Sequence, residues 1–234
     1  MNGVIKTIDV PMIIGIDFDN TIIDYNNLVY ETGLSLGVLP DNVGCNKITI
    51  RDYLIEKGRE QDWHKIQGLV YGKYIRHAKV MEGFSSFADL CYEKGWKIYI
   101  ISHKTRDSII GERFNLRSSA LIWLEDNRIY GTDIRAAVEG IFFESTRSEK
   151  VYRINQLGCD IMIDDLAEVL LHPDLSNEII KILYDSHAKN TPNPGYFTAA
   201  GWDQICGIIN IGFQANLKKN STKIFYEVDK REDL

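Results

Sequence analysis

Two aspartates near the start of the chain, Asp17 and Asp19, have the residue type and spacing of a catalytic pair. They directly follow the apolar run Pro11–Ile16, and a short unbroken apolar run is typical of a buried strand. Ligands of open α/β sheets bind at the carboxyl ends of such strands. Carboxylates that are costly to desolvate need a counter-charge, which is usually a hard divalent cation. One aspartate could then attack while the other carries a proton. The alternative is a turn or a helix N-cap rich in Asp and Asn.

Later apolar runs also end in polar side chains, which are predicted to converge with the first pair at one edge of a sheet. Paired acids suit Mg²⁺, which prefers oxygen ligands and keeps several waters. A hydroxyl and a lysine beside them suit an oxyanion such as phosphate, whose charge the lysine and the metal would neutralise together. The residues are Ser102 after a run at 97–101, Lys150 at an expected helix start, and Asp164 and Asp165 after a run at 160–163.

Five short apolar segments are predicted as strands, and helical patterns separate the last four. The two clearest helical patterns, Ser85–Lys94 and Lys150–Leu157, both stop at a glycine, which is a common helix terminator. Helix, glycine and buried strand in succession indicate βαβ units. The predicted fold class is therefore α/β, with a Rossmann-like parallel sheet in a three-layer α/β/α core. The predicted strands are Met12–Ile16, Lys97–Ile101, Val138–Phe143, Asp160–Ile163 and Ile179–Tyr184.

Residues 22–84 interrupt this alternation and contain no clear buried strand. Helices are expected at Asn26–Gly37 and Thr49–Gly58, and a longer one at Gln61–Ala78. A connection of this length is well above normal, so the first strand is predicted to be followed by a helical insert. The predicted division is a core of residues 1–21 and 85–210, the insert at 22–84, and a C-terminal extension at 211–234 with an edge strand at Lys223–Val228.

Composition excludes several classes of function. The chain has 234 residues and a net charge of −6, so it lacks the basic footprint of a protein that binds nucleic-acid polymers. Its four cysteines show no metal-binding spacing and are expected to be reduced. Neither a signal peptide nor a membrane-spanning segment is expected. These features favour a cytoplasmic protein with no membrane partner.

The chemistry-bearing residues occur in an order that resembles the haloacid dehalogenase-like (HAD) superfamily of hydrolases, in its phosphatase type. An apolar strand followed by Asp-x-Asp-x-Thr matches residues 14–21, and a strand that ends in Ser matches Ser102. A lysine at a helix start matches Lys150, and an acidic pair after a strand matches Asp164 and Asp165. The first and fourth motifs are the more specific. The resemblance implies that the insert is a helical cap, which would exclude water and favour a small substrate.

The resemblance also implies a role for each matching residue. Asp17 would be the nucleophile that forms an aspartyl-phosphate, and Asp19 would be the general acid and base. Lys150 would hold Asp17 and the phosphate together, while Thr21 would position Asp19 and Ser102 would position the phosphoryl group. The implied phosphate-binding residues are Thr21, Ser102 and His103, and the implied magnesium site comprises Asp17, the backbone carbonyl of Asp19, Asp164, and Asp165 beside the metal-bound waters.

Several of these residues have alternative structural interpretations. Ser102 could cap the next helix, and Lys150 could be a solvated residue with Arg147 in the cationic role. Asp165 could be the N-cap of a helix at 166–171, and His103 could lie in an exposed loop. Within the insert, Trp63, Tyr71 and Tyr74 are expected to pack in the core, and Lys65, Lys73, Arg76 and His77 to reach an anionic substrate or to lie on a solvated face.

The predicted function is a magnesium-dependent phosphomonoesterase that acts on a small phosphorylated metabolite, such as a sugar phosphate. The resemblance implies that dehalogenases lack the second aspartate, because a halide leaving group needs no proton; Asp19 therefore favours phosphate esters. One alternative is a deoxyribonucleotidase of the same superfamily, whose closing segment is similar to residues 182–190 and 201–205. Two others are a phosphomutase and a non-catalytic binding or regulatory protein. A homodimer is one option that the sequence leaves open.

Overall fold

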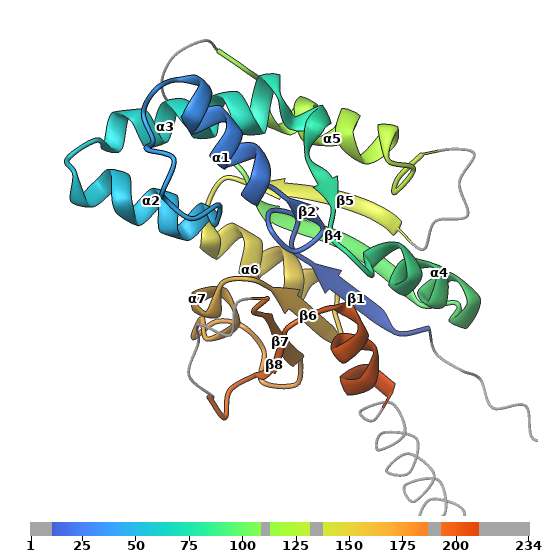
Figure 1. The fold of residues 1–234 in the computed structure, drawn as a ribbon. Coiled ribbons are helices and arrows are strands. Elements are labelled where there is room, and N and C mark those ends of the chain that lie inside the picture. Colours follow the sequence, from blue (N-terminus) through green and yellow to red (C-terminus); the bar gives the residue numbers. More distant parts are fainter. Residues whose placement is uncertain (1–10, 109–112, 132–137, 187–192, 211–234) are drawn as a thin grey trace, which may run out of the picture.

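A six-stranded parallel sheet forms the centre of the molecule (Figure 1). The computed structural model describes residues 11–108, 113–131, 138–186 and 193–210, and all structural statements concern these residues. The strand order is β5-β4-β1-β6-β7-β8, and every neighbouring pair is parallel. The predicted α/β sheet is therefore confirmed. Its strands are β1 (Ile13–Ile16), β4 (Lys97–His103), β5 (Val138–Glu144), β6 (Ile161–Asp164), β7 (Ile180–Tyr184) and β8 (Phe197–Ala199).

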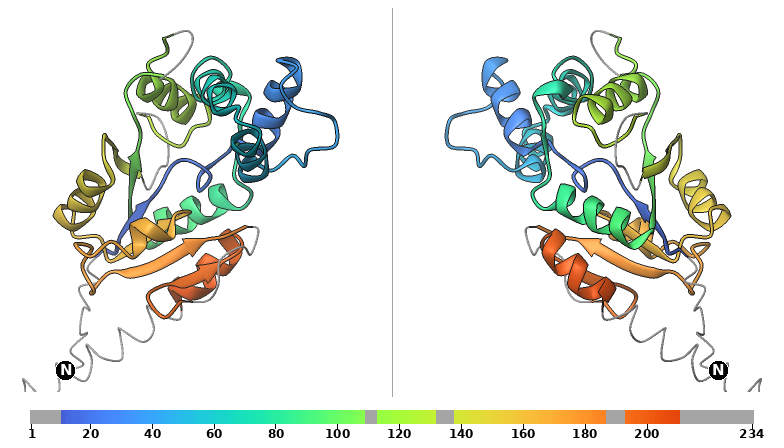
Figure 2. Two further views of the ribbon diagram at one scale, coloured as in Figure 1. Left: turned by 90° about the vertical axis from the view of Figure 1, so that its left-hand side faces the viewer. Right: turned by 90° about the vertical axis from the view of Figure 1, so that its right-hand side faces the viewer.

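Both faces of the sheet are buried, which explains why its central strands read as continuous apolar runs. Successive residues of β6 point to opposite faces: Ile161 and Ile163 join one apolar cluster, whereas Met162 joins the other. Figure 2 shows helices on both sides of the sheet, which is the predicted three-layer core. The first face packs against α4 (Phe84–Lys94), α5 (Leu116–Asp126) and a helix at 202–210, and the second against α6 (Arg147–Gln156) and α7 (Ala167–Leu170).

A helical insert follows β1, as predicted, and lies beyond the carboxyl end of that strand (Figure 1). Two short strands, β2 (Ile23–Asp24) and β3 (Lys79–Val80), pair antiparallel and hold its two ends side by side. The predicted limits of the insert and of the core stay predictions. Between the paired strands lie α1 (Asn26–Ser35), α2 (Lys47–Glu56), α3 (Glu60–Gly68), the π-helix η1 (Leu69–Lys73) and the 3₁₀-helix η2 (Ile75–His77).

The prediction of one continuous helix over residues 61–78 is wrong, because the α-helix ends at Gly68 and a π-helical turn follows. In this turn Gly72 lies directly against Phe114, where a β-carbon would approach the Phe114 side chain to 2.5 Å. The wide turn also places the ring of Tyr71 4.6 Å from that of Tyr25. Tertiary contacts with the core therefore override the helical pattern of this segment.

The helix that carries Lys150 begins earlier than the sequence pattern indicates. A capping box sets its start: the Thr146 hydroxyl accepts a hydrogen bond from the Glu149 backbone, and the Glu149 carboxylate accepts one from the Thr146 backbone. Lys150 is thus not the first residue of the helix but lies at the end of its first turn. Its side chain points into the core and is buried.

Parts of the chain differ from the sequence predictions or fall outside the structure. The helix α5 and the edge strand β8 were not predicted. The predicted extension at 211–234, with its strand at 223–228, lies outside the described residues. Among the described residues, no helix combines the length and the apolar character that a membrane crossing requires.

Candidate active site

The loop after β1 is a tight turn that carries polar side chains into the molecule. The Asp17 amide donates to the Ile163 carbonyl at 2.9 Å, which ties the first residue of the loop to β6. Phe18 is fully buried and contacts the edge of Trp123, with ring centroids 5.6 Å apart. Asn20 turns the chain with a φ of +60°, in the left-handed region that Asn tolerates better than most residues. The turn interpretation is therefore confirmed, and it is compatible with a catalytic role, which stays a prediction.

A buried lysine lies between two buried aspartates at the carboxyl ends of β1 and β6. Lys150 Nζ is 2.6 Å from an oxygen of Asp17 and 2.6 Å from an oxygen of Asp164. All three side chains are at most 6% exposed. Burial alone would lower the pKa of Lys150, but the two carboxylates outweigh it and raise the pKa above its usual range. The rival cation, Arg147, is exposed at the start of the same helix.

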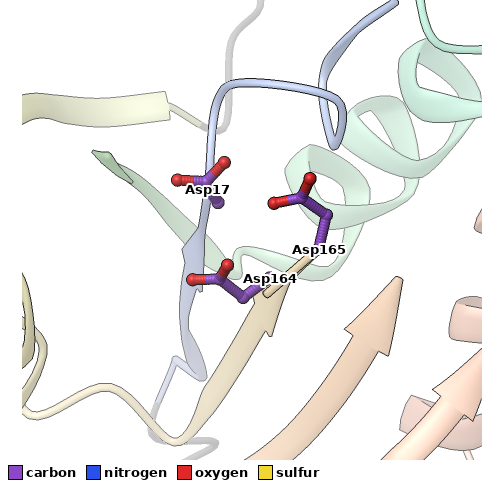
Figure 3. Close-up of side chains that lie close together, drawn as sticks. All are labelled: Asp17, Asp164 and Asp165. Atoms are coloured by element: carbon purple, nitrogen blue, oxygen red, sulfur yellow. The ribbon is translucent and has the colours of Figure 1, made fainter. Parts of the chain in front are cut away.

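Three carboxylates gather close enough to hold one cation (Figure 3). Oxygens of Asp17, Asp164 and Asp165 all lie within 4.8 Å of one another. Burial, opposed by Lys150, raises the pKa of Asp164 to about 6. Burial and the charges of Asp17 and Asp164 raise the pKa of Asp165 to about 8. Such crowding of carboxylates is relieved by a hard divalent cation, so the donor set fits Mg²⁺.

The loop residue Asn20 also belongs to this group, because its side-chain amide donates to Asp165 at 3.1 Å. The alternative of Asp165 as a helix N-cap is wrong. The cap of α7 is Leu166, which makes no side-chain cap bond, and the Leu166 amide donates to Asp164 instead. Asp165 is therefore left to face the carboxylate group.

Asp19 turns its carboxylate away from this cluster and toward a second buried lysine. Lys104 Nζ contacts both carboxylate oxygens, at 2.9 and 2.8 Å, and the Tyr25 hydroxyl donates to one of them at 2.8 Å. Burial alone would raise the pKa of Asp19, but Lys104 and then Lys47 outweigh it and hold the pKa below its ordinary value. The metal role assigned to the backbone carbonyl of Asp19 stays a prediction.

Two of the three predicted phosphate-binding side chains are buried hydroxyls with unused hydrogen-bonding capacity. Thr21 and Ser102 are at most 1% exposed, and neither hydroxyl has a hydrogen-bond partner among the described residues. Ser102 therefore does not cap a helix through its hydroxyl. His103 is exposed, and its Nε2 lies 3.0 Å from the Ser145 carbonyl. Unsatisfied buried hydroxyls call for a ligand, and a phosphoryl group would satisfy them.

A cavity of about 180 Å³ lies between the core and the insert. Asp19, His103 and Lys104 line it from the core, whereas His64, Gln67 and Tyr71 line it from the insert. Tyr71 thus faces a cavity, although the sequence favoured a packing role. The four insert cations expected near an anionic substrate line neither this cavity nor the next; they are Lys65, Lys73, Arg76 and His77, all exposed.

A second cavity of about 150 Å³ is bordered by Asp165, one of the three clustered carboxylates. It is lined by Asn20 and Asp165 of the core and by Lys47 and Arg51 of the insert, among others. Lys47 Nζ lies 5.4 Å from the centre of the Tyr71 ring. Asp19 therefore borders one cavity and Asp165 the other.

Sequence reasoning assigned no site role to Asn20, Tyr25, Lys47 and Lys104, which the structure brings to this site. Asn20 and Lys104 lie within or beside the recognised motifs, so their position in the sequence was a usable signal. Tyr25 and Lys47 carry no such signal, because only the folding of the insert brings them to Asp19.

Comparison with known proteins shows similarity in structure. No protein-family model and no curated protein matches the sequence. A predicted phosphatase from Clostridium acetobutylicum has a TM-score of 0.55 at 14% identity, over 86% of this chain and 99% of its own. The HAD-hydrolase YfnB from Bacillus subtilis, whose structure is bound to magnesium, has a TM-score of 0.53 at 12% identity, over 86% of this chain and 99% of its own. A dehalogenase has a TM-score of 0.51 at 9% identity, over 86% and 98%.

These similarities extend over most of this chain and nearly all of each other protein. At such low sequence identity they concern the fold, and they include both a predicted phosphatase and a dehalogenase. The predicted resemblance is confirmed at that level: the chain has the fold of the HAD-superfamily hydrolases.

Proposed function

We propose that this protein is a magnesium-dependent phosphomonoester hydrolase of the HAD superfamily that works through an aspartyl-phosphate on Asp17. The observation that carries the proposal is the buried carboxylate of Asp17, which contacts the Lys150 ammonium at 2.6 Å and gathers with the carboxylates of Asp164 and Asp165. A nucleophile, a cation for the phosphoryl oxygens and a metal-binding group thus meet at one strand end.

The charge balance of the site supports the metal and the phosphate. The four carboxylates of Asp17, Asp19, Asp164 and Asp165 face two buried lysines, Lys104 and Lys150. The acids outnumber the lysines even when Lys47, whose charge acts on Asp19 and Asp165, is counted, and a divalent cation would offset the difference. When bound, Mg²⁺ would neutralise charge on the phosphoryl oxygens. YfnB, which shares the fold, is bound to magnesium.

In the first step Asp17 would attack phosphorus in line with the departing ester oxygen. The new bond joins a carboxylate oxygen of Asp17 to phosphorus, the ester bond breaks, and the leaving oxygen takes a proton from Asp19. Lys150 would neutralise charge on the transferring group, and the free hydroxyl of Ser102 would donate to one of its oxygens.

In the second step Asp19 would take a proton from a water that attacks the aspartyl-phosphate. This step releases inorganic phosphate and restores the Asp17 carboxylate. The contacts of Asp19 with Lys104 and Tyr25 favour its ionised form, which is the form that can act as a base. The same lowered pKa makes the protonated form, which the first step requires, a readier proton donor.

A phosphate ester is favoured over an alkyl halide because the loop keeps a second carboxylate beside a cavity. Departure of a halide needs no proton donor, so Asp19 would have no part in that reaction. The cavity at Asp19 measures about 180 Å³ and suits a small leaving group. We therefore propose a small phosphorylated metabolite as substrate. A cytoplasmic location and the absence of membrane or nucleic-acid partners stay predictions of the sequence.

Release of phosphate from a panel of sugar phosphates, nucleotides and p-nitrophenyl phosphate tests this function. We expect magnesium-dependent turnover that is lost with EDTA and restored by added Mg²⁺. The Asp17→Asn variant should lose activity by about 10³-fold or more, because an amide cannot form the intermediate. Asp89→Asn, an exposed aspartate of α4, is the matched control and should remain active.

Acid-quenched protein should carry a phosphoryl group on the peptide that contains Asp17. Full activity in Asp17→Asn would exclude the assigned nucleophile. Absence of turnover across the whole panel with magnesium present would contradict the proposed hydrolase function.

A further inference from the structure

Lys104 is a buried lysine that forms an ion pair with Asp19. Its side chain is 2% exposed, and its ammonium contacts both oxygens of that carboxylate. The backbone of Lys104 is fixed as well, because its amide donates to the Glu144 carbonyl and its carbonyl accepts from the Arg117 guanidinium. Both ends of the residue are therefore held in place.

Aromatic side chains complete the enclosure of this ion pair. Lys104 Nζ lies 5.0 Å from the centre of the Tyr71 ring and 5.3 Å from that of Phe18, distances typical of cation–π contacts. The Tyr25 hydroxyl adds a third hydrogen bond to the Asp19 carboxylate. With three donor contacts on two oxygens, Asp19 has one defined orientation.

This orientation exposes Asp19 to the cavity between core and insert. Asp19 and Lys104 both line that cavity. The Asp19 side chain is 20% exposed, whereas that of Lys104 is 2% exposed. Asp17, by contrast, faces Lys150. A phosphate ester held at Asp17 would thus have its leaving group on the Asp19 side.

We propose that Lys104, assisted by the Tyr25 hydroxyl, is a positioning residue that aims the Asp19 carboxyl group at the leaving oxygen of the substrate. The inference rests on the proposed function. As the bond from Asp17 to phosphorus forms and the ester bond breaks, the proton moves from Asp19 to the departing oxygen and yields a free alcohol. Lys104 neither gives nor takes a proton in this step.

The leaving group provides a test that a purely structural role would not pass. Nitrophenolate leaves without a proton, whereas an alkoxide does not, so an alkyl ester depends more on Asp19. The ratio kcat/KM reports the first step, because phosphoryl transfer to Asp17 releases the alcohol. We expect Lys104→Met to lower kcat/KM for glycerol phosphate by about 10²-fold and for p-nitrophenyl phosphate by less than about 5-fold.

Companion variants separate positioning from folding. Asp19→Asn should show the same selectivity, and the double variant Lys104→Met/Asp19→Asn should be no worse than Asp19→Asn, because both changes remove one function. Lys104→Arg, which keeps the charge and the donors, should recover part of the loss on glycerol phosphate. Tyr25→Phe, which removes only a hydroxyl, should give a weaker selective loss. The control is Lys65→Met, an exposed lysine of the insert, which should match the wild type.

An equal loss on both esters in Lys104→Met, or additive losses in the double variant, would overturn the positioning role. If Lys104→Met does not fold, Lys104→Arg and Tyr25→Phe test the positioning role by the same comparison of kcat/KM for the two esters. Equal losses on both esters in these variants again overturn the positioning role. Failure of the proposed function looks different, because the wild-type protein would then turn over neither ester.

Discussion

Asp165 is the residue whose ionisation most strongly links the metal site to the stability of the protein. Its pKa lies near 8 in the folded state, against an ordinary value of 3.8. Between these values the folded protein holds a proton that the unfolded chain has lost. The resulting stabilisation is fully present below pH 3.8 and is lost as the pH rises through 8.

We therefore expect the melting temperature of the metal-free protein to fall more steeply between pH 6 and 9 in the wild type than in Asp165→Asn. Each kcal/mol corresponds to roughly 2–4 °C for a chain of this size. Added Mg²⁺ should offset the fall, because it binds the ionised carboxylates of the folded state. Thermal melts at several pH values, with and without Mg²⁺, measure both effects. Parallel pH profiles for the two proteins would contradict this account.

Residues within a motif were predicted better than the residues that support them. Asp17 and Asp164 could be placed from sequence because each lies at the carboxyl end of a buried strand, and parallel strands bring their ends to one edge. Lys150 could be placed by its motif, although its helix begins three residues earlier. Tyr25 and Lys47 gave no comparable pattern, because a lone tyrosine or lysine of the insert gains its role only from what tertiary folding places beside it; Lys104, next to a predicted strand end, could have been found.

The π-helical turn η1 is the element that joins the insert to the core. Its Gly72 lies against Phe114, and its Tyr71 lies between Tyr25 and Lys104. A regular α-helix through this segment would turn these residues to other directions. A π-turn within a helix often marks a functional site, and here it lines the cavity at Asp19.

Gly72→Ala should destabilise the protein by about 1–3 kcal/mol, because the added methyl group overlaps the Phe114 side chain. Urea unfolding measures the change. Gly207→Ala is the matched control. Gly207 lies in the helix at 202–210, and a β-carbon there would meet no atom within 4 Å. Alanine at this position should leave the stability unchanged or raise it by up to about 1 kcal/mol. In a protein that already carries Phe114→Ala, Gly72→Ala should cost less stability, because the side chain that the methyl group overlaps is gone. If the stability losses of the two single variants simply add in the double variant, the strain does not come from this contact.

Strands that are buried on both faces were predicted from the sequence more accurately than exposed ones. The five predicted strands agree with the structure to within about two residues at most ends because strands buried on both faces are apolar throughout. The edge strand Phe197–Ala199 escaped notice because it is short and two of its three residues are exposed. The helix α5 does have apolar residues at helical spacing, among them Leu116, Ala120 and Trp123, so its pattern was sufficient for a prediction.

Trp202 connects the end of the described chain to the loop that follows β1. It is 1% exposed, its indole donates to the Thr21 carbonyl at 3.2 Å, and its ring packs against Phe84, Phe87 and Tyr184. The two hydrogen-bonded residues are 181 positions apart. The molecule as a whole, and not the first motif alone, therefore holds the loop in place.

Trp202→Phe should cost about 2–4 kcal/mol of stability, because it leaves a buried carbonyl without its donor and opens a gap in the aromatic cluster. We also expect a lower kcat, since the loop that carries Asp19 loses an anchor. Urea unfolding and steady-state kinetics measure the two effects. Tyr152→Phe, on an exposed ring, is the control. Unchanged stability in Trp202→Phe would show that the loop does not depend on this contact.

The position of Asp17 beside Lys150 has a consequence for protein synthesis. The two residues are 133 positions apart, and translation at about 5–20 residues per second separates their appearance by on the order of ten seconds. During that time Asp17 has no lysine partner, and β1 has gained its neighbour β4 but not yet its neighbour β6. One edge of β1 therefore stays unpaired until β6 has been made, and an unpaired apolar strand edge is a surface that chaperones can bind.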